Sequence, residues 1–575
     1  MNIIQFSKEE CNHCYRCLRA CSSKAIKIMD KHAEVVNDRC IACGECEVVC
    51  PKGAVKVLSN VKEIKEVIKS DKKVIASIAP SFSGAFEMKD PMQIVTALRK
   101  LGFDHIEETA IGAEIVSNLY KDYVDNGDIK NLVTTSCPSA NYLIEKYYPS
   151  LIKYMLPIVS PMMAHGKLIK HNYGMDCHVV FIGPCIAKKF EANDFQNEGI
   201  INSVLNFEEL QTWIEDEGID LKKLKPTRFD KESFKIGNKF PIKRGVATSF
   251  LDSNNHDNYE VIQVDGIEEC KEILECLKKD NLEGVCVELN VCKGSCIGGP
   301  FMPKESGNFH LRKKKIKEYV KTKKECINDI DYDYSNIDFN IKFLDKSIKK
   351  DIPSEKEIEE ILRKMGKYES KDELNCYACG YKTCREKAQA VYEGMAELEM
   401  CLPYMRSKAE SLRNLIFEQS PNAIFLLECD NFIIKELNPA CEKLFNINAD
   451  DLVGKPVSIL LKDECIKKVK ETGEDLIGKK SSFPKYGLVL YRNVLYIEKQ
   501  NVIMVILTDV TDEEKNKEEL AKVKENTINA AQDVIDKQMR VAQEIASLLG
   551  ETTAETKATL TKLKNIAIGE KGDKE

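Results

Sequence analysis

The side chains best suited to chemistry in this sequence are its cysteines, of which there are 24 in 575 residues. Sixteen of them fall into three groups, marked by spacing or by local context. Closely spaced thiolates bind iron–sulfur clusters or zinc, whereas disulfide frameworks are typical of small proteins in oxidising compartments. The sequence opens without the basic and apolar segments of a secretory signal. We therefore expect metal centres in a reducing cytoplasm, such as that of an anaerobe.

The first group repeats the spacing C-x2-C-x2-C-x3-C. Its members are Cys11, Cys14, Cys17 and Cys21, then Cys40, Cys43, Cys46 and Cys50, with Pro51 following the second run. In two-cluster ferredoxins the fourth cysteine of each run ligates the other cluster. The pattern therefore predicts one 4Fe-4S cluster on Cys11, Cys14, Cys17 and Cys50, and another on Cys40, Cys43, Cys46 and Cys21. Two zinc sites are the alternative, although zinc rarely uses three cysteines at this spacing.

Two further groups have four cysteines each. Cys376, Cys379, Cys384 and Cys401 have the spacing C-x2-C-x4-C-x16-C, which resembles a small 4Fe-4S domain of anaerobic redox proteins; zinc is harder to exclude here. Cys137, Cys185, Cys292 and Cys296 lie far apart in sequence. Their three loops follow short apolar runs, and the carboxyl ends of parallel strands meet at one edge of a sheet. We therefore expect these four cysteines to form a single site.

The elements that must position these cysteines alternate along the chain. Apolar runs at 74–78, 132–134 and 179–182 are separated by amphipathic stretches, and a charged helix is predicted at 61–73. This alternation is typical of α/β folds with mostly parallel sheets. The net charge of −7 argues against a nucleic-acid surface. No apolar run of about 18 residues is present, so we expect no membrane span.

The loops at 135–138, 183–191 and 288–299 resemble, in order, the three signature motifs of the FeFe-hydrogenases, over roughly residues 75–300. The resemblance implies an H-cluster, in which a 4Fe-4S cluster is joined to a diiron subcluster carrying carbonyl, cyanide and a bridging dithiolate amine. Its ligands would be Cys137, Cys185, Cys292 and Cys296, with Cys296 bridging to the diiron unit. Lys188 would donate a hydrogen bond to a cyanide, and Ser81 and Ser160 would contact the same unit.

The sequence departs from that family along its usual proton route. Catalytic members have a second cysteine before the first-motif ligand, where this chain has Ser136, a much weaker acid. Two relay glutamates and a serine are replaced by Tyr120, Tyr123 and Leu156, and other motif positions hold Ala140, Gly183 and Asn290. Losing a general acid or base costs about 10²–10⁴ in rate. We therefore expect H2 binding with slow, reversible chemistry.

Residues 409–512 resemble a PAS domain through the segments 420–424, 437–441, 450–454 and 509–511. Such a domain binds a small ligand or dimerises, and both alternatives stay open. The last histidine is His310, so this region has no histidine to ligate haem and the tail no phosphoacceptor histidine. Apolar residues in the tail recur at near-heptad spacing, which favours a dimerising or partner-binding helix. They are Leu520, Val523, Val534, Val541, Ile545 and Leu548.

These patterns predict a multidomain protein. Its parts are an α+β ferredoxin domain with two 4Fe-4S clusters (1–57), a two-lobed α/β H-cluster domain (58–345), a small helical 4Fe-4S domain (346–404), an α+β PAS domain (405–514) and a helical signalling tail (515–575).

The function that we predict is H2 sensing by a slow FeFe-hydrogenase-type oxidoreductase that passes its redox state to a partner. Expected partners are H2, a redox protein such as ferredoxin, hydrogenase maturation proteins, a downstream kinase or phosphatase, and a second copy of the chain; neither nucleic acid nor a membrane is expected. The alternatives are a metabolic, ferredoxin-linked hydrogenase with a non-standard proton path, and an iron–sulfur redox or assembly protein that does not use H2.

Overall fold

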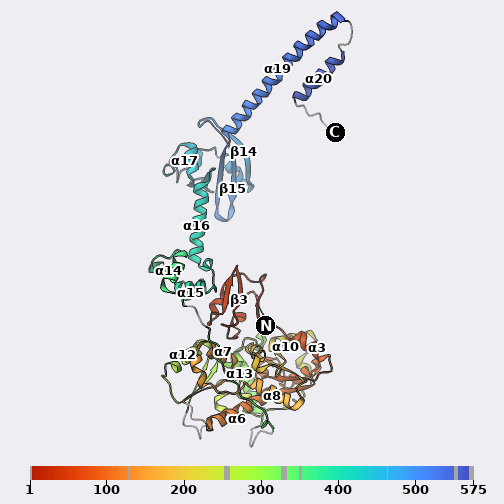
Figure 1. The fold of residues 1–575 in the computed structure, drawn as a ribbon, viewed down its shortest axis with the longest axis vertical. Coiled ribbons are helices and arrows are strands. Elements are labelled where there is room, and N and C mark those ends of the chain that lie inside the picture. Colours follow the sequence, from red (N-terminus) through yellow and green to blue (C-terminus); the bar gives the residue numbers. More distant parts are fainter. Residues whose placement is uncertain are drawn as a thin grey trace. The chain divides into compact units, whose positions relative to one another are not determined.

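The computed structural model describes residues 3–126, 130–251, 259–324, 333–348, 352–462, 464–549 and 554–568. The chain divides into two compact units, Met1–Tyr404 and Met405–Glu575. Both are drawn in Figure 1, coloured from red to blue along the sequence. Each unit has its own apolar core and is described by itself.

The first unit begins with two small antiparallel strand pairs, β1 with β4 and β2 with β3. Their elements are β1 (Ile4–Phe6), α1 (Arg16–Ala20), β2 (Ile26–Met29), β3 (His32–Val35), α2 (Glu45–Val48) and β4 (Val55–Val57). Each short helix carries the third cysteine of one run and the loop before it the first two, so that the two runs lie in equivalent positions. This is the α+β ferredoxin domain that the cysteine spacing predicts.

The α/β region of the first unit holds two parallel sheets. The four-stranded sheet has the order β6-β5-β8-β9 and the three-stranded sheet the order β10-β11-β7. The strands are β5 (Val74–Ile78), β6 (His105–Glu108), β7 (Asn131–Val133), β8 (His178–Gly183), β9 (Ser203–Asn206), β10 (Glu260–Asp265) and β11 (Val285–Asn290). Strands β5, β8 and β11 are buried along their whole length, as parallel strands covered on both faces must be. The predicted α/β fold with two lobes and parallel sheets is confirmed.

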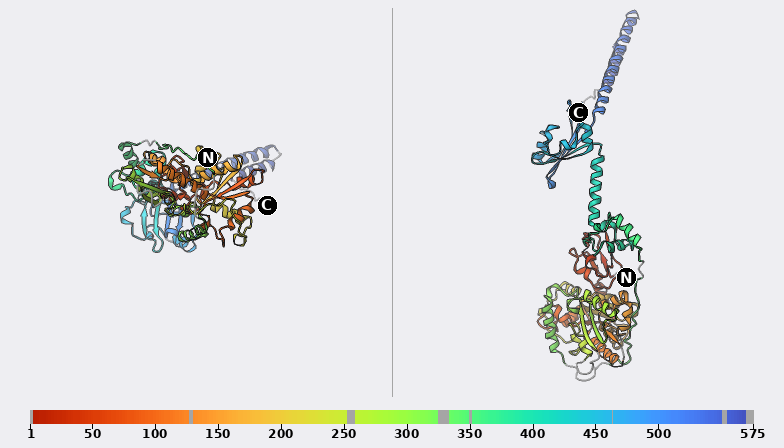
Figure 2. Two further views of the ribbon diagram at one scale, coloured as in Figure 1. Left: turned by 90° about the horizontal axis from the view of Figure 1, so that it is seen from below. Right: turned by 90° about the vertical axis from the view of Figure 1, so that its left-hand side faces the viewer.

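Helices surround these sheets, as Figure 2 shows from two further directions. They are α3 (Val61–Ile68), α4 (Phe82–Ala85), α5 (Gln93–Leu101), α6 (Ala110–Asn126), α7 (Pro138–Tyr147), α8 (Pro161–Tyr173), α9 (Ala187–Ala192), α10 (Phe207–Asp216), α11 (Ala247–Phe250), α12 (Ile267–Lys278) and α13 (Phe309–Thr322). The helix predicted at 61–73 ends earlier, because the chain turns at Lys69 towards β5.

The first unit ends with a small helical domain, built on α14 (Glu355–Lys364) and α15 (Cys384–Tyr392). It packs on the ferredoxin domain, and Figure 1 shows α15 close to the red segment that holds β3. Apolar residues of both domains form one buried cluster, which includes Leu18, Ile26, Tyr381 and Met395. The Met395 carbonyl also accepts a hydrogen bond from the Ile28 N–H, at 2.9 Å.

The second unit is built on one antiparallel sheet of order β13-β12-β16-β15-β14. Its elements are α16 (Leu402–Gln419), which begins just before the unit, β12 (Ala423–Glu428), β13 (Ile434–Leu437), α17 (Pro439–Phe445), α18 (Glu464–Thr472), β14 (Leu476–Phe483), β15 (Leu488–Ile497) and β16 (Val502–Asp509). Alternate residues of β12 and β16 are buried, which gives the sheet one face in the core.

The tail consists of α19 (Thr511–Leu549) and α20 (Ala554–Ile568). Helix α19 is 39 residues long and follows β16 after a single residue, four residues before the predicted tail. Five apolar side chains of α19 are 49–62% exposed and are not packed into a core among the described residues: Leu520, Val523, Val534, Val541 and Ile545. The side chain of Leu548 lies outside the described residues.

Candidate functional site

A cavity of about 110 Å³ lies where the carboxyl ends of strands from both parallel sheets converge. Strands β5 and β8 of one sheet meet β7 and β11 of the other here, each ending at a loop that lines the cavity. All four widely separated cysteines are on its wall: Cys137, Cys185, Cys292 and Cys296. The structure therefore brings together the four residues that the sequence predicts as one site.

The local backbone explains how each cysteine reaches the cavity. Cys137 is the residue before α7, and Pro138 begins that helix, where a missing N–H costs nothing. Cys296 lies in a tight turn after Gly294, which has φ +84°. A Cβ at Gly294 would stand 2.4 Å from the Phe309 ring, and one at Gly298 would stand 1.8 Å from the Lys293 carbonyl oxygen. Only glycine fits these two positions, so the turn that presents Cys296 is fixed by sterics.

Three of the four thiols, those of Cys185, Cys292 and Cys296, resist ionisation on their own. Burial raises the pKa of Cys185 to about 11 and that of Cys296 to about 12, and it raises the pKa of Cys292 strongly. Each neighbouring thiolate raises these values further, because like charges repel. A bound cation removes both penalties and deprotonates the thiol. The four sulfurs are thus suited to a group that brings positive charge.

Lys188 brings a cation to the same wall. It lies in α9, is 8% exposed, and lowers the pKa of Cys185 and Cys296 through its charge. Its Nζ donates to Ser160 Oγ and to Glu191 Oε2, both at 2.7 Å. An ammonium has three N–H groups, so one remains for a group inside the cavity. Ser160 itself does not line the cavity, but its hydroxyl accepts a hydrogen bond from Lys188.

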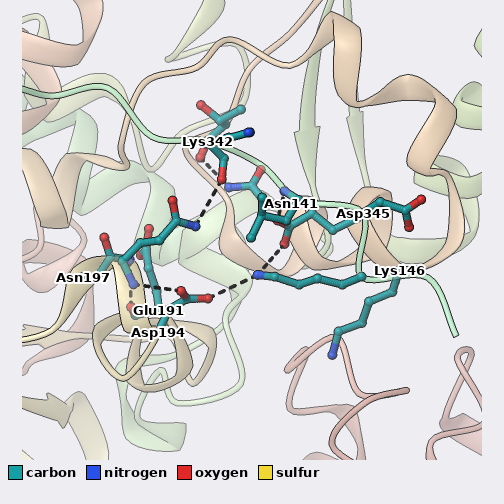
Figure 3. A network of polar contacts seen from close by, with 12 residues as sticks. Asn141, Lys146, Glu191, Asp194, Asn197, Lys342 and Asp345 are labelled. Atoms are coloured by element: carbon teal, nitrogen blue, oxygen red, sulfur yellow. Dashed lines mark hydrogen bonds and ion pairs between the residues drawn. The ribbon is translucent and has the colours of Figure 1, made fainter.

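Glu191 is in turn anchored in a polar network, drawn in Figure 3. Asn197 donates from Nδ2 to the Glu191 carbonyl at 2.9 Å. Lys346, from the segment at 333–348, bridges Asp194 at 3.2 Å and Glu145 at 3.0 Å. The network joins the segment at 333–348 to α7 and to the loop that follows α9, and it fixes the backbone of Glu191 at the end of that helix.

Three hydroxyls complete the polar part of the wall. Ser81, Ser136 and Ser295 each line the cavity with a buried Oγ that has no partner among the described residues. Buried hydroxyls without partners are costly, and native proteins keep them where a ligand satisfies them. Four thiols, one spare ammonium N–H and three unpaired hydroxyls fit a cluster that carries polar ligands. Sequence reasoning predicted Ser81 and Ser136 here and missed Ser295.

The positions of the family's proton route do not form a relay here. The Tyr120 hydroxyl lies 2.9 Å from Thr135 Oγ1, whose own hydrogen points to the carbonyls of Leu156 and Ile158 at 3.0 and 2.9 Å. A carbonyl oxygen has no proton to pass on. Tyr123 is 36% exposed and Leu156 is a buried aliphatic side chain. The series of hydrogen bonds therefore ends at the backbone.

A buried acid beside the cavity escaped sequence reasoning. Asn290 lines the cavity and donates to Glu288 Oε1 at 3.3 Å. Burial raises the pKa of Glu288 to about 7, against the lowering effect of the Ala247 N–H that it accepts at 2.8 Å. Alternation in β11 places Glu288 and Asn290 on one face of the strand. That alternation was the available signal.

The ferredoxin cysteines gather in the crossed arrangement that their spacing predicts. Cys11, Cys14, Cys17 and Cys50 line one small cavity. Cys21 lies instead near Cys40, Cys43 and Cys46, since the charge of its thiolate raises the pKa of all three. Cys43 also lines the large cavity and raises the pKa of Cys292 there. The second ferredoxin group is therefore the neighbour of the four-cysteine site.

The third group also forms one small site. Cys376, Cys379, Cys384 and Cys401 line a single cavity, together with Lys387. Burial lowers the pKa of Lys387 to about 8. This site touches the ferredoxin domain, since Arg19 donates both to the Cys14 carbonyl at 2.8 Å and to the Ala378 carbonyl at 3.1 Å. Three cysteine sites and the large cavity thus follow one another through the first unit.

Within the described residues, no three histidine, cysteine or acidic side chains stand close enough to hold a single metal ion. Over the same residues, no helix is long and apolar enough to cross a membrane.

Comparison with protein families assigns three regions of the chain. Residues 72–300 match the iron-only hydrogenase large subunit, C-terminal domain. Residues 10–54 match a 4Fe-4S dicluster domain and residues 372–403 a putative Fe-S cluster domain. These regions contain all three cysteine groups, and the matches support iron–sulfur cofactors in this chain.

Individual relatives are more distant. Iron hydrogenase 1 of Clostridium pasteurianum is 28% identical over 318 residues, 47% of this chain and 55% of that protein. The cytosolic Fe-S cluster assembly factor NAR1 of Yarrowia lipolytica is 26% identical over 170 residues, 27% of this chain and 35% of that protein. A solved structure of FeFe-hydrogenase HydA1 from Chlamydomonas reinhardtii has 17% identity and a TM-score of 0.39, covering 45% of this chain and 88% of that one. The chain spans little more than half the length of that Clostridium hydrogenase and of the NADP-reducing hydrogenase subunit HndD of Solidesulfovibrio fructosivorans.

Proposed function

We propose, from the premise that residues 72–300 belong to the FeFe-hydrogenase-like family, that this chain is a cytoplasmic H2 sensor with slow hydrogenase chemistry. The observation that carries the proposal is the large cavity, where four cysteines from two sheets meet Lys188 and three unpaired hydroxyls. A zinc site would use none of these polar groups. A cluster with cyanide and carbonyl ligands would use them all.

The chain's own residues define how such a group is held. Cys137, Cys185, Cys292 and Cys296 would bind it, with Cys296 bridging to the diiron part, and Lys188 would donate to a cyanide. When bound there, an H-cluster supplies an iron that binds and splits H2. The apolar remainder of the wall excludes water, which strengthens the hydrogen bonds from Lys188 and Ser81.

Electrons would leave through the cysteine sites in series. The order along this path is the cavity, the cluster on Cys40, Cys43, Cys46 and Cys21, the cluster on Cys11, Cys14, Cys17 and Cys50, and the cluster on Cys376, Cys379, Cys384 and Cys401. The contacts of Cys43 at one end and of Arg19 at the other support this order. A ferredoxin-like protein would exchange electrons with the series.

The second unit would convert the redox state into a signal. Its five-stranded antiparallel sheet supports the proposal of a PAS domain. Asn438 connects that sheet to the incoming helix α16 by donating to the Phe417 carbonyl at 3.0 Å. On the outgoing side, Lys480 of β14 pairs with Glu514 of α19. The exposed apolar residues of α19 would form a dimer or dock a kinase or phosphatase. Maturation proteins would deliver the diiron group.

Infrared spectroscopy of anaerobically matured protein tests the proposal. We expect carbonyl and cyanide bands that shift when H2 replaces argon, together with turnover about 10² or more below that of an enzyme with a complete proton relay. Bands that do not shift under H2 would rule out H2 sensing. High specific activity would instead indicate a metabolic hydrogenase.

A second candidate function is suggested by the similarity to NAR1, a cytosolic Fe-S cluster assembly factor. The interrupted proton route favours this alternative, since an assembly factor needs no protons in the cavity. Full iron loading without carbonyl or cyanide bands would establish it.

A further inference from the structure

We propose that protons cross the α/β domain along a buried series of hydrogen-bonded side chains, which leads from the cavity to the surface. In order from the cavity its members are Thr109, Ser77, His165, Glu107 and Tyr173. The inference rests on the proposed function, for which it supplies the missing proton route. None of these residues belongs to the route of Ser136, Tyr120 and Leu156.

The inner half begins on the cavity wall. Thr109 follows β6, lines the cavity and is 4% exposed. Its Oγ1 lies 2.7 Å from Ser77 Oγ, and Ser77 Oγ lies 2.8 Å from His165 Nδ1. Both distances are normal for strong hydrogen bonds. Unlike the hydrogen bonds of Tyr120, this series does not end at a backbone carbonyl.

The outer half reaches solvent. His165 Nε2 lies 3.1 Å from Glu107 Oε2, and neither side chain has any exposed surface. The other carboxylate oxygen accepts from the half-buried Tyr173 hydroxyl at 2.7 Å, and the Lys231 ammonium, 30% exposed, lies 3.9 Å away. Burial opposes charge on Glu107, but His165, Tyr173 and Lys231 together hold its pKa below the usual value. Each carboxylate oxygen of Glu107 therefore has a group that can carry a proton, Tyr173 or His165, within hydrogen-bond distance.

Close packing between two helices brings these residues within hydrogen-bond distance of one another. His165 lies in α8, which packs against α6 at Gly112. A Cβ at Gly112 would stand 2.2 Å from the Pro161 carbonyl oxygen and 2.7 Å from the His165 backbone nitrogen. Glycine at this position lets α8 approach, so that the imidazole reaches both β5 and β6. A serine–histidine–glutamate series also resembles a hydrolytic triad, but Ser77 is fully buried and no substrate reaches it.

One proton moves through the series as follows. The Tyr173 O–H bond breaks as an O–H bond forms on Glu107 Oε1, and Tyr173 regains a proton from solvent water. The protonated carboxyl group then turns towards His165, and its O–H bond breaks as an N–H bond forms at Nε2 of the tautomer that carries its hydrogen on Nδ1. The N–H bond at Nδ1 breaks as Ser77 Oγ takes that proton and releases its own to Thr109 Oγ1. Thr109 releases its former hydroxyl proton into the cavity. Each member gains and loses one proton, and the electrons travel separately through the iron–sulfur sites.

The first test does not need the diiron group. Protein assembled with iron–sulfur clusters only is moved into D2O, and the bands of Glu107 and its partner imidazole are identified by subtracting the infrared spectrum of Glu107→Gln. We expect the isotope shift within about a minute, because the pair communicates with solvent. Bands that stay unshifted for hours would show a sealed structural pair and overturn the inference.

The second test uses a matched pair of variants in matured protein. Ser77→Ala interrupts the series, whereas Ser203→Ala makes the same change at a second buried serine–histidine pair, with His178 at 2.8 Å, that does not line the cavity. We expect Ser77→Ala and Thr109→Val to lower kcat by about 10²-fold and Ser203→Ala to leave it within about twofold. Carbonyl and cyanide bands, and their shift under H2, should be the same in all three.

The outcomes separate the two proposals. Native kcat in Ser77→Ala with intact bands would overturn the proton route and leave the H2 function standing. Fast isotope exchange in a chain that never turns over H2 would remove the proposed function, and the connection between Glu107 and solvent would still be supported.

Discussion

The large cavity and the third cysteine site each bring together one predicted group of four cysteines, but they are built in different ways. The cavity takes its cysteines from loops spread over 160 residues and two sheets, while the third site takes them from 26 residues around one short helix. The cavity has room beyond its cysteines and polar groups that face it, whereas the third site is small. The cavity therefore has space and polar groups for more than a simple cluster, whereas the third site has space for little beyond its four cysteines.

The largest effect should come from Cys292→Ala. We expect it to abolish the carbonyl and cyanide bands and the response to H2, because one of four ligands from two sheets is lost. Iron content and infrared spectra measure this. Cys177→Ala, at a buried cysteine outside the three groups, is the matched control and should keep both. Retained bands in Cys292→Ala would contradict the assigned ligand set.

Cys379→Ala tests the other side of the comparison. We expect the loss of one cluster's iron and of its electron paramagnetic resonance signal, with the infrared response of the cavity to H2 unchanged. The half-buried Cys276→Ala serves as control. If the bands of the cavity disappeared as well, the two sites would not be independent.

Lys188→Met should destabilise the first unit by about 3–5 kcal/mol, since it leaves the Glu191 carboxylate buried without its cation. The double variant Lys188→Met with Glu191→Gln should recover most of this loss. Urea unfolding of the protein without diiron group measures both. Equal stability of the single and double variants would mean that Glu191 finds another partner.

The last prediction concerns the pH dependence of stability at Glu114, which burial keeps at a pKa of about 8 in the folded protein. The folded state holds this proton more tightly than the unfolded state, whose carboxyl has a pKa near 4.5. The free energy of unfolding should therefore fall as pH rises from about 4.5 to about 8, by at most about 1.4 kcal/mol per pH unit. Glu114→Gln should remove the contribution of Glu114 and leave that of Glu288, whose pKa burial raises to about 7, while the exposed Glu318→Gln should leave both. Urea titrations at pH 5, 6.5 and 8 would show it.

The sequence predicts those parts of the molecule that depend on local spacing or period. The crossed pairing of Cys21 and Cys50 follows from the ferredoxin pattern, and the strands at 74–78 and 179–182 follow from uninterrupted apolar runs. It also predicts that the cysteine loops meet, because parallel strands end at a common edge. These inferences need no knowledge of which distant elements touch.

The sequence does not predict which side chains from distant parts of the chain contact one another. Ser77 and His165 are 88 residues apart, and nothing in either neighbourhood indicates that helix packing at Gly112 will bring them together. Ser160 was expected at the bound group but lies behind Lys188, because the direction of the α9 side chain decides which hydroxyl it meets. The docking of the third cysteine site on the ferredoxin domain likewise depends on two carbonyls that carry no sequence signal.

Helix α16 begins at Leu402, directly after Cys401. Cys401, which is predicted to bind the third cluster, is therefore joined by one peptide bond to the helix that enters the second unit. No loop lies between the cysteine and the helix. Backbone dihedrals are the only soft coordinates at such a junction. If a cluster is bound there, a change of its charge or the loss of its iron would act on the backbone directly before the first turn of α16.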